Sequence, residues 1–326
     1  MTMTRFIKQG MAGITLLLAN AAAHAADDYP VRPIFLEVGF EAGGPTDVVA
    51  RIMAKAMSAN LKTSVIVENK PGASASIAAN DVMRAAPDGY RLLVSTSVLT
   101  VNPLLYPDRY KYDTVKAFEP VGNFVTLPMV MVTNYDSPYK SVQDLVADAK
   151  AHPSKVSYGS SGVGSSAHLT GEMLATQAGI TMIHVPYKGN GPALQETIAG
   201  RISFMFFPSV GIANYVNSKR LRVLALGSKD LRTTFPGVPT LDSIGYTGFE
   251  EGSTWVGLLA PANTPKPIVE KLNQAAITAL NTPDVREQLA SLGAVVQGDT
   301  SENFRRFLIE DKTRWSTVIQ HSDLKP

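Results

Sequence analysis

The chain alternates short apolar runs, typical of buried strands, with longer segments in which apolar residues recur at helical spacing. Strands are predicted over residues 34–38, 64–67, 91–95, 130–133, 156–158, 182–185, 202–206, 222–226 and 256–259. Helices are predicted over residues 47–58, 74–85, 142–150, 166–177, 191–199, 210–218, 267–281, 283–292 and 301–316. This alternation predicts an α/β fold with mostly parallel sheets flanked by helices. Ligands of such sheets bind beyond the carboxyl ends of the strands, so the functional loops should follow strands.

Two glycine-rich junctions connect a predicted strand directly to a predicted helix. The first is Phe40-Glu-Ala-Gly-Gly-Pro-Thr-Asp47, and the second is Gly159-Ser-Ser-Gly-Val-Gly-Ser-Ser166. The first amides of a helix have no acceptor within the helix and lie at the positive end of its dipole, so each junction can seat an anion. Two such junctions suggest two lobes that grip a carboxylate or a phosphate between them.

The N-terminus has the pattern of a secretory signal peptide. Arg5 and Lys8 precede an apolar run over residues 11–18 and the small-residue motif Ala23-His-Ala25. We expect residues 1–25 to be removed near Ala25 or Ala26, which predicts export to a bacterial periplasm. The apolar run is shorter than the roughly 20 residues that span a bilayer, so no permanent anchor is expected. The chain contains no cysteine, which excludes disulfides and thiolate metal sites.

Composition narrows the possible functions further. The chain of 326 residues is 45% hydrophobic, and the part left after processing is long enough for two domains. Its 30 basic and 28 acidic residues are scattered, without the basic cluster that nucleic-acid binding requires. No two histidines of the mature chain stand close together in the sequence, and neither junction has the Gly-Lys-Ser/Thr ending of a nucleotide loop. We therefore expect no nucleic acid, metal or cofactor.

Several motifs stand in the order and spacing of one known family. They are Tyr29-Pro-Val-Arg-Pro-Ile34, the first glycine-rich junction, Val67-Glu-Asn-Lys-Pro-Gly-Ala73, Ala86-Pro-Asp-Gly-Tyr90, His184-Val-Pro-Tyr-Lys-Gly189 and Pro239-Thr240. With these motifs the mature chain resembles the substrate-binding receptors of tripartite tricarboxylate transporters, also called the Bug family. The resemblance covers essentially the whole mature chain.

The resemblance implies a periplasmic receptor, not an enzyme, with two α/β lobes that close like a Venus flytrap on a small carboxylate. Such a receptor delivers its solute to a secondary transporter with one large and one small membrane subunit, and a monomer suits this task. The first lobe would hold residues 26–123 and 253–326, and the second lobe residues 124–252.

The resemblance also implies a set of ligand contacts made largely by backbone amides and hydroxyls. In the first lobe they fall on Phe40, Ala42, Gly43, Gly44 and Thr46, with Asp47 holding the loop, and Ser95 and Ser97 complete the lining. In the second lobe they fall on Ser160, Ser161, Gly162, Gly164, Ser165, His168, Lys188 and Gly189.

Two positions depart from the pattern of the family, and both are candidate ligand contacts. Glu41 would place a carboxylate beside a seat for an anion, whereas many relatives have a small residue or proline there. Phe207 stands where many relatives have an acidic or small residue, and it favours an apolar or aromatic ligand body.

Other interpretations remain open. Ser165, His168 and a distant aspartate could form the triad of an exported serine hydrolase, but the turn lacks the Gly-x-Ser-x-Gly elbow. A sensor adaptor that docks to a membrane receptor kinase would use the same carboxylate site. The ligand could be a citrate-like acid, an acidic amino acid, nicotinate or an aromatic dicarboxylate.

Overall fold

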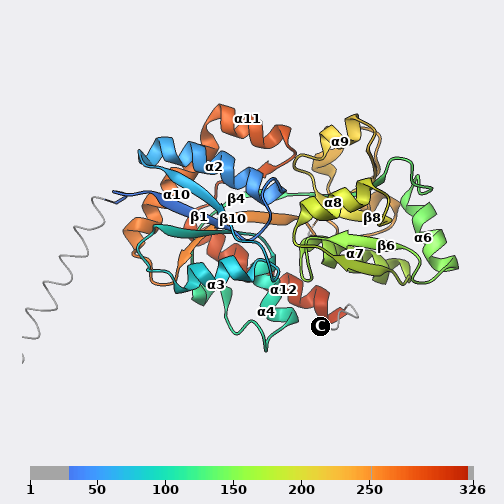
Figure 1. Cartoon of the computed structure of the whole chain (residues 1–326), viewed down its shortest axis with the longest axis horizontal. Helices are drawn as coiled ribbons and strands as arrows, with labels where there is room; N and C mark the ends of the chain where they lie inside the picture. Colours follow the sequence, from blue (N-terminus) through green and yellow to red (C-terminus); the bar gives the residue numbers. More distant parts are fainter. Residues whose placement is uncertain (1–28, 251, 322–326) are drawn as a thin grey trace, which may run out of the picture.

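The computed structural model describes residues 29–250 and 252–321, so the predicted signal peptide lies outside the described residues. Two α/β lobes lie side by side, each built on one sheet with helices on both faces (Figure 1). We call the lobe that begins the described chain the first lobe and the other the second lobe. The predicted two-lobed α/β fold is confirmed.

The first lobe contains a six-stranded sheet in the order β11-β4-β10-β3-β1-β2. Its strands are β1 (Ile34–Val38), β2 (Val65–Asn69), β3 (Arg91–Ser95), β4 (Phe118–Leu127), β10 (Thr254–Pro261) and β11 (Val295–Val296). Its helices are α2 (Pro45–Leu61), α3 (Ser76–Arg84), α4 (Val98–Leu105), α5 (Thr114–Ala117), α10 (Lys266–Asn281), α11 (Pro283–Ser291) and α12 (Ser301–His321).

The second lobe contains a five-stranded sheet in the order β7-β6-β8-β5-β9. Its strands are β5 (Met129–Asn134), β6 (Ser157–Ser160), β7 (Ile183–Pro186), β8 (Phe204–Pro208) and β9 (Leu221–Leu226). Its helices are α6 (Val142–Ala151), α7 (Ser166–Ala178), α8 (Asn190–Ile198) and α9 (Ala213–Asn217), with 3-10 turns η1 (Lys229–Arg232) and η2 (Asp242–Ile244).

The sheets are mixed, not mostly parallel as the sequence pattern predicted. β1 pairs in parallel with β2 and β3, and β6 with β7 and β8, but β10 is antiparallel to β3 and β4, and β5 to β8 and β9. β5 and β10 are the strands by which the chain enters each sheet from the other lobe. They enter at the edge where the parallel strands end, so they must run in the opposite direction.

Two strands, β4 and β11, and two helices, α4 and α5, were absent from the sequence prediction, as were the 3-10 turns η1 and η2. The alternation of β4 is interrupted by Pro120 and Gly122, and Pro103 lies inside α4, so local patterns argued against both elements. Pairing with β10 along its whole length makes the β4 segment a strand in spite of its proline.

Each sheet buries apolar side chains on both faces. In β8, Phe204 and Phe206 pack with the residues of α6 and α7, whereas Met205 and Phe207 pack on the opposite face with those of α8. This alternation follows from the two-residue period of a strand. Both faces of the second lobe are therefore closed by apolar packing, which leaves the ends of the strands for polar chemistry.

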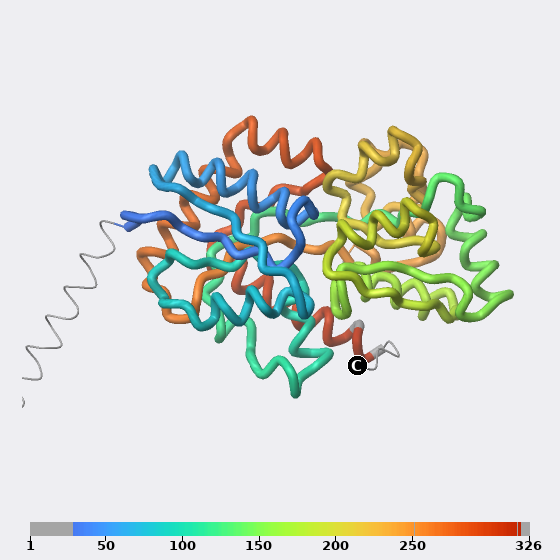
Figure 2. The backbone as a smooth tube through the Cα atoms, in the orientation of Figure 1, coloured from blue at the N-terminus to red at the C-terminus, as the bar shows by residue number. Residues whose placement is uncertain are grey.

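The two lobes contact each other directly. The hydroxyl of Ser74 donates to the carbonyl of Val163 across the gap at 2.9 Å, and that of Ser209 donates to the carbonyl of Gly293 at 2.7 Å. Figure 2 shows the red C-terminal segment reaching the place where the two lobes meet, and Trp315 of this segment packs with residues of both lobes. The arrangement is a closed one.

Candidate functional site

Two adjoining cavities lie between the lobes. The outer cavity has a volume of about 550 Å³, and the inner cavity has a volume of about 20 Å³. Phe40 and Ser161 line both, so the two cavities adjoin each other. Both cavities take their lining from loops of both lobes, which means that their size depends on how far the lobes are closed.

The inner cavity lies where several helices begin. Thr46 is the second residue of α2, Ser166 and Ala167 begin α7, Asn190 begins α8, and Thr96 directly precedes the N-cap of α4. The first amides of these helices have no acceptor within the helix and carry partial positive charge. The other described lining residues are Phe40, Met129, Ser161, Ser165, Pro208 and Thr254. None of the described side chains in this lining is charged, so the positive potential comes from the backbone.

Asp47 organises the first glycine-rich junction. It accepts hydrogen bonds from the amide of Gly43 at 2.8 Å, from Arg51 at 2.8 Å and from Asn69 at 2.9 Å. Burial alone would raise the pKa of Asp47, but these hydrogen bonds outweigh it and lower the pKa. Because the amide of Gly43 is bonded to Asp47, it is not free for a ligand.

In the second glycine-rich junction, side chains likewise accept hydrogen bonds from backbone amides of the turn. Ser160 Oγ accepts from the amide of Gly162 at 3.1 Å, and His168 Nδ1 accepts from the amide of Gly164 at 3.1 Å. Ser165 is the N-cap of α7 and accepts from the amide of His168 at 3.4 Å. The amides of Gly162 and Gly164 therefore shape the turn, and the free donors are those at the start of α7.

His168 and His184 support this turn from inside. Their rings stack with centroids 3.9 Å apart, and His184 Nε2 lies 2.7 Å from Ser160 Oγ. Burial, with a smaller contribution from the neighbouring His184, lowers the pKa of His168 to about 3, and burial lowers that of His184 to about 4. Such a ring is a weak base at neutral pH, and His168 Nδ1 is already engaged, so the geometry does not favour a serine hydrolase.

The predicted site residues fall into three groups. Those that line a cavity are Phe40, Glu41, Thr46, Ser161, Gly162, Ser165 and Lys188. Those that lie outside both linings but are buried around them are Gly44, Asp47, Ser95, Ser97, Ser160, Gly164, His168 and Gly189. Ala42 and Gly43 are exposed.

The placement of Phe207 differs from the prediction. Phe207 is 4% exposed and packs in the apolar cluster between the second sheet and α8, away from both cavities. The alternation along β8 turns its side chain into the core, so Phe207 lines neither cavity.

Sequence reasoning missed residues that reach the cavities from distant parts of the chain. In the outer cavity they are Gly72, Ala73, Ser74, Ala75, Val163, Pro186, Tyr187 and Pro192. In the inner cavity they are Thr96, Met129, Ser166, Ala167, Asn190, Pro208 and Thr254. The motif that ends at Ala73 was visible in the sequence, but only the fold brings it to the cleft.

The walls of the outer cavity are mostly apolar or aromatic, with one charged residue from each lobe. Glu41 comes from the first lobe and Lys188 from the second, and no ion pair joins them to each other or to another described residue. This cavity can hold an apolar ligand body and offers one charge of each sign.

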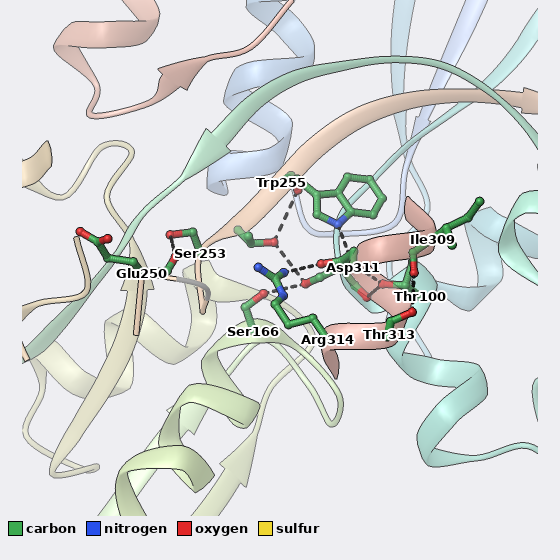
Figure 3. Close-up of polar contacts among 11 residues, drawn as sticks. Thr100, Ser166, Glu250, Ser253, Trp255, Ile309, Asp311, Thr313 and Arg314 are labelled. Atoms are coloured by element: carbon green, nitrogen blue, oxygen red, sulfur yellow. Dashed lines mark hydrogen bonds and ion pairs between the residues drawn. The ribbon is translucent and has the colours of Figure 1, made fainter. Parts of the chain in front are cut away.

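Hydroxyl groups join the lobes beside the inner cavity. Ser97 Oγ lies 2.6 Å from Ser166 Oγ of the second lobe and 3.3 Å from Thr254 Oγ1 of β10. Figure 3 shows Ser166 at this junction, with Trp255 and Thr100 both donating to Asp311 of α12 nearby.

The described residues include no group of three or more acidic, histidine or cysteine side chains placed to hold a metal. None of the described helices combines the length and apolar character needed to cross a bilayer.

Comparison with known proteins gives a consistent result. The profile of the tripartite tricarboxylate transporter family receptor matches residues 49–324. Protein BugT of Bordetella pertussis is 34% identical over 328 residues, which covers 100% of this chain and 99% of BugT.

Solved structures of similar proteins share the fold. The periplasmic binding protein BugD superposes with a TM-score of 0.86 at 33% identity, over 91% of this chain and 99% of BugD. MatC from Rhodopseudomonas palustris, solved with bound malate, has a TM-score of 0.84 at 30% identity, over 89% of this chain and 100% of MatC. Rpa4515 of R. palustris, solved with adipate, has a TM-score of 0.85 at 30% identity, over 90% and 98% of the two chains.

Proposed function

Because this chain belongs to the tripartite tricarboxylate transporter receptor family, we propose that it is a periplasmic receptor that captures a small carboxylate between its lobes. It delivers this solute to a secondary transporter with a large and a small membrane subunit. The observation that carries the proposal is the convergence of helix N-termini from both lobes on one uncharged, hydroxyl-lined cavity. Such a cavity attracts an anion and holds it by hydrogen bonds.

The two cavities bind different parts of the ligand. The inner cavity, at about 20 Å³, has room for about one water molecule in the closed arrangement. Its lining comes from both lobes, so a small separation of the lobes enlarges it enough to admit a carboxylate group. The outer cavity, at about 550 Å³, lies within the range of pockets that bind small molecules and holds the body of the ligand.

The energy required is modest. A micromolar dissociation constant corresponds to about 8 kcal/mol. A few hydrogen bonds to a charged group, each worth about 1.5 to 3 kcal/mol, together with some apolar burial supply this amount. Amides of both lobes reach the ligand only when the lobes lie close together, so the ligand stabilises an arrangement near the closed one over a wide-open cleft.

We assign ligand contact to Phe40, Glu41, Thr46, Ser161, Gly162, Ser165 and Lys188, which line the cavities, and loop support to Asp47. MatC with malate and Rpa4515 with adipate support a small carboxylate as the ligand class. The lobe boundaries at residues 123/124 and 252/253 remain a proposal, and the extent of β4 favours moving the first crossing to Pro128. Family membership favours transport over sensing, which would use the same cleft.

Gly44→Asp tests the anion seat. Gly44 is the N-cap of α2 with φ −76°, and a Cβ added there would meet its nearest neighbour, the carbonyl oxygen of Glu41, at 3.5 Å. An aspartate fits this backbone and is a good N-cap, so the fold should remain intact. Its carboxylate would occupy the end of α2 and repel a carboxylate ligand. We expect loss of the thermal stabilisation that a carboxylate library produces in the wild type.

Gly44→Ala is the matched control, because it adds the Cβ without the charge and should keep ligand-induced stabilisation. Circular dichroism of both variants checks the fold. If Gly44→Asp were stabilised by the same carboxylates as the wild type, the anion seat would be wrongly assigned.

A further inference from the structure

Asn190 is a polar residue of the inner cavity that has no partner. It is the first residue of α8 and lies in the lining with the hydroxyls of Thr46 and Ser161. Its Oδ1 atom is shut off from solvent and accepts no hydrogen bond, and its Nδ2 atom donates none to another described residue. Buried polar atoms are nearly always paired in folded proteins, so this one requires an explanation.

The side-chain amide of Asn190 differs from the hydroxyl groups of the same lining in the hydrogen bonds that it can form. A hydroxyl rotates and serves as donor or acceptor, but a side-chain amide presents one donor group and one acceptor group at fixed positions. A bare carboxylate only accepts hydrogen bonds, so it could satisfy Nδ2 and would leave Oδ1 unpaired. A ligand with a hydrogen-bond donor on the carbon next to its carboxylate would satisfy both atoms.

A hydroxyl suits this donor position on the ligand better than an ammonium group does. The inner cavity lies at the N-termini of several helices, whose partial positive charges disfavour a cation. No described carboxylate lines this cavity, and Glu41 lines only the outer one. A neutral hydroxyl can donate to Asn190 Oδ1 without this electrostatic cost.

Resting on the proposed carboxylate-receptor function, we propose that Asn190 makes this protein selective for 2-hydroxycarboxylates. The carboxylate accepts from the helix amides and from Asn190 Nδ2, and the 2-hydroxyl donates to Asn190 Oδ1. The rest of the ligand extends into the outer cavity, where Lys188 is available to a second carboxylate.

Matched ligand pairs test this selectivity by isothermal titration calorimetry. Malate is compared with succinate, and 2-hydroxyglutarate with glutarate, so that each pair differs only in the hydroxyl. One hydrogen bond to a neutral group corresponds to a preference of about tenfold for the hydroxy acid in the wild type. Asn190→Ala should remove this preference, chiefly by weakening the binding of the hydroxy acid.

Two controls separate selectivity from folding. Asn214→Ala replaces an exposed asparagine in the first turn of α9 of the same lobe and should leave the preference unchanged. If circular dichroism shows that Asn190→Ala is unstable, Asn190→Ser takes its place in the test. This variant keeps a small polar group at the start of α8 and should reduce the preference for the hydroxy acid.

Three results would overturn the inference and leave the carboxylate receptor intact. The first is equal affinity of the wild type for the members of each pair. The second is an equal loss of affinity for both members in Asn190→Ala, which would make Asn190 a simple carboxylate donor. The third is tighter binding of aspartate than of malate, which would mean that an ammonium group is preferred. In contrast, failure of every carboxylate in a wider library to bind would overturn the proposed function itself.

Discussion

At the scale of single residues, the stacked pair His168 and His184 links the site to the stability of the second lobe. Both rings are buried, and both hold the glycine-rich turn through hydrogen bonds to Gly164 and Ser160. Burial lowers their pKa values to about 3 and about 4, from the ordinary value of 6.5. The folded protein therefore keeps both rings neutral at pH values where the unfolded chain takes up protons.

This difference predicts a loss of stability in mild acid. The contribution is complete above pH 6.5 and is lost as the pH falls from 6.5 towards the folded pKa values of about 3 to 4. At pH 5 the loss should be about 2 kcal/mol for each histidine. Denaturant unfolding between pH 4.5 and 7.5 measures it.

His168→Gln should reduce the pH dependence of unfolding without abolishing it, because glutamine does not titrate whereas His184 remains. A wild-type stability that did not change between pH 7 and pH 5 would show that the two rings are not held neutral by burial.

At the scale of elements, the loop before α3 forms the wall of the outer cavity in a strained conformation. Ala73, Ser74 and Ala75 all have positive φ, at 46°, 50° and 66°, which costs about 1 to 3 kcal/mol for each residue. Asn102 donates to the carbonyl of Ser74 at 2.9 Å, and Tyr110 donates to that of Ala73 at 3.3 Å. These contacts hold the loop so that the Ser74 hydroxyl reaches Val163 of the other lobe.

Ser74→Ala removes a hydrogen bond that exists only when the lobes are closed. We expect weaker ligand binding by about three- to tenfold, corresponding to about 0.5 to 1.5 kcal/mol. The change should appear mainly as faster ligand dissociation in stopped-flow measurements, because closure retains the ligand.

Ser218→Ala is the control for this prediction, since the Ser218 hydroxyl bonds only within its own lobe, to Asn214 and Tyr215. Unchanged dissociation in Ser74→Ala would mean that this loop does not take part in closure.

At the scale of the whole molecule, α12 connects the lobes. Buried Asp311 holds α12 against the rest of the first lobe, because it accepts hydrogen bonds from Thr100 at 2.6 Å and from Trp255 at 3.1 Å. One turn later, Trp315 is 1% exposed and packs with Leu105 of α4 and with Leu169 of the second lobe. Opening the cleft must therefore separate or rearrange this cluster.

Trp315→Ala should favour the open arrangement. We expect a larger radius of gyration without ligand in small-angle X-ray scattering, and a loss of about 3 to 5 kcal/mol in the free energy of unfolding. Ile309→Ala on the same helix is the control, because Ile309 is 50% exposed and should change neither quantity. A radius of gyration equal to that of the wild type would show that α12 does not restrain the lobes.

The sequence alone determined the local features of this protein. The alternation of strands and helices, the two glycine-rich junctions and the motifs of the family were all readable, because each depends on residues close together in the chain. The nine predicted strands each correspond to an observed strand; the bounds agree for β1 and β3, and the ends are shifted in the other seven. β4 was missed because Pro120 is unfavourable in a strand judged by its local sequence. Pairing with β10 overrides this local preference.

Only the tertiary structure decided which groups are available to a ligand. Gly43 and Gly164 were expected to contact the ligand, but their amides donate to Asp47 and His168. Phe207 turns into the core because of its position in the sheet, and Asn190 stands unpaired in the inner cavity. A sequence shows which donors and acceptors a loop contains. Whether each one is already paired depends on neighbours that only folding brings together.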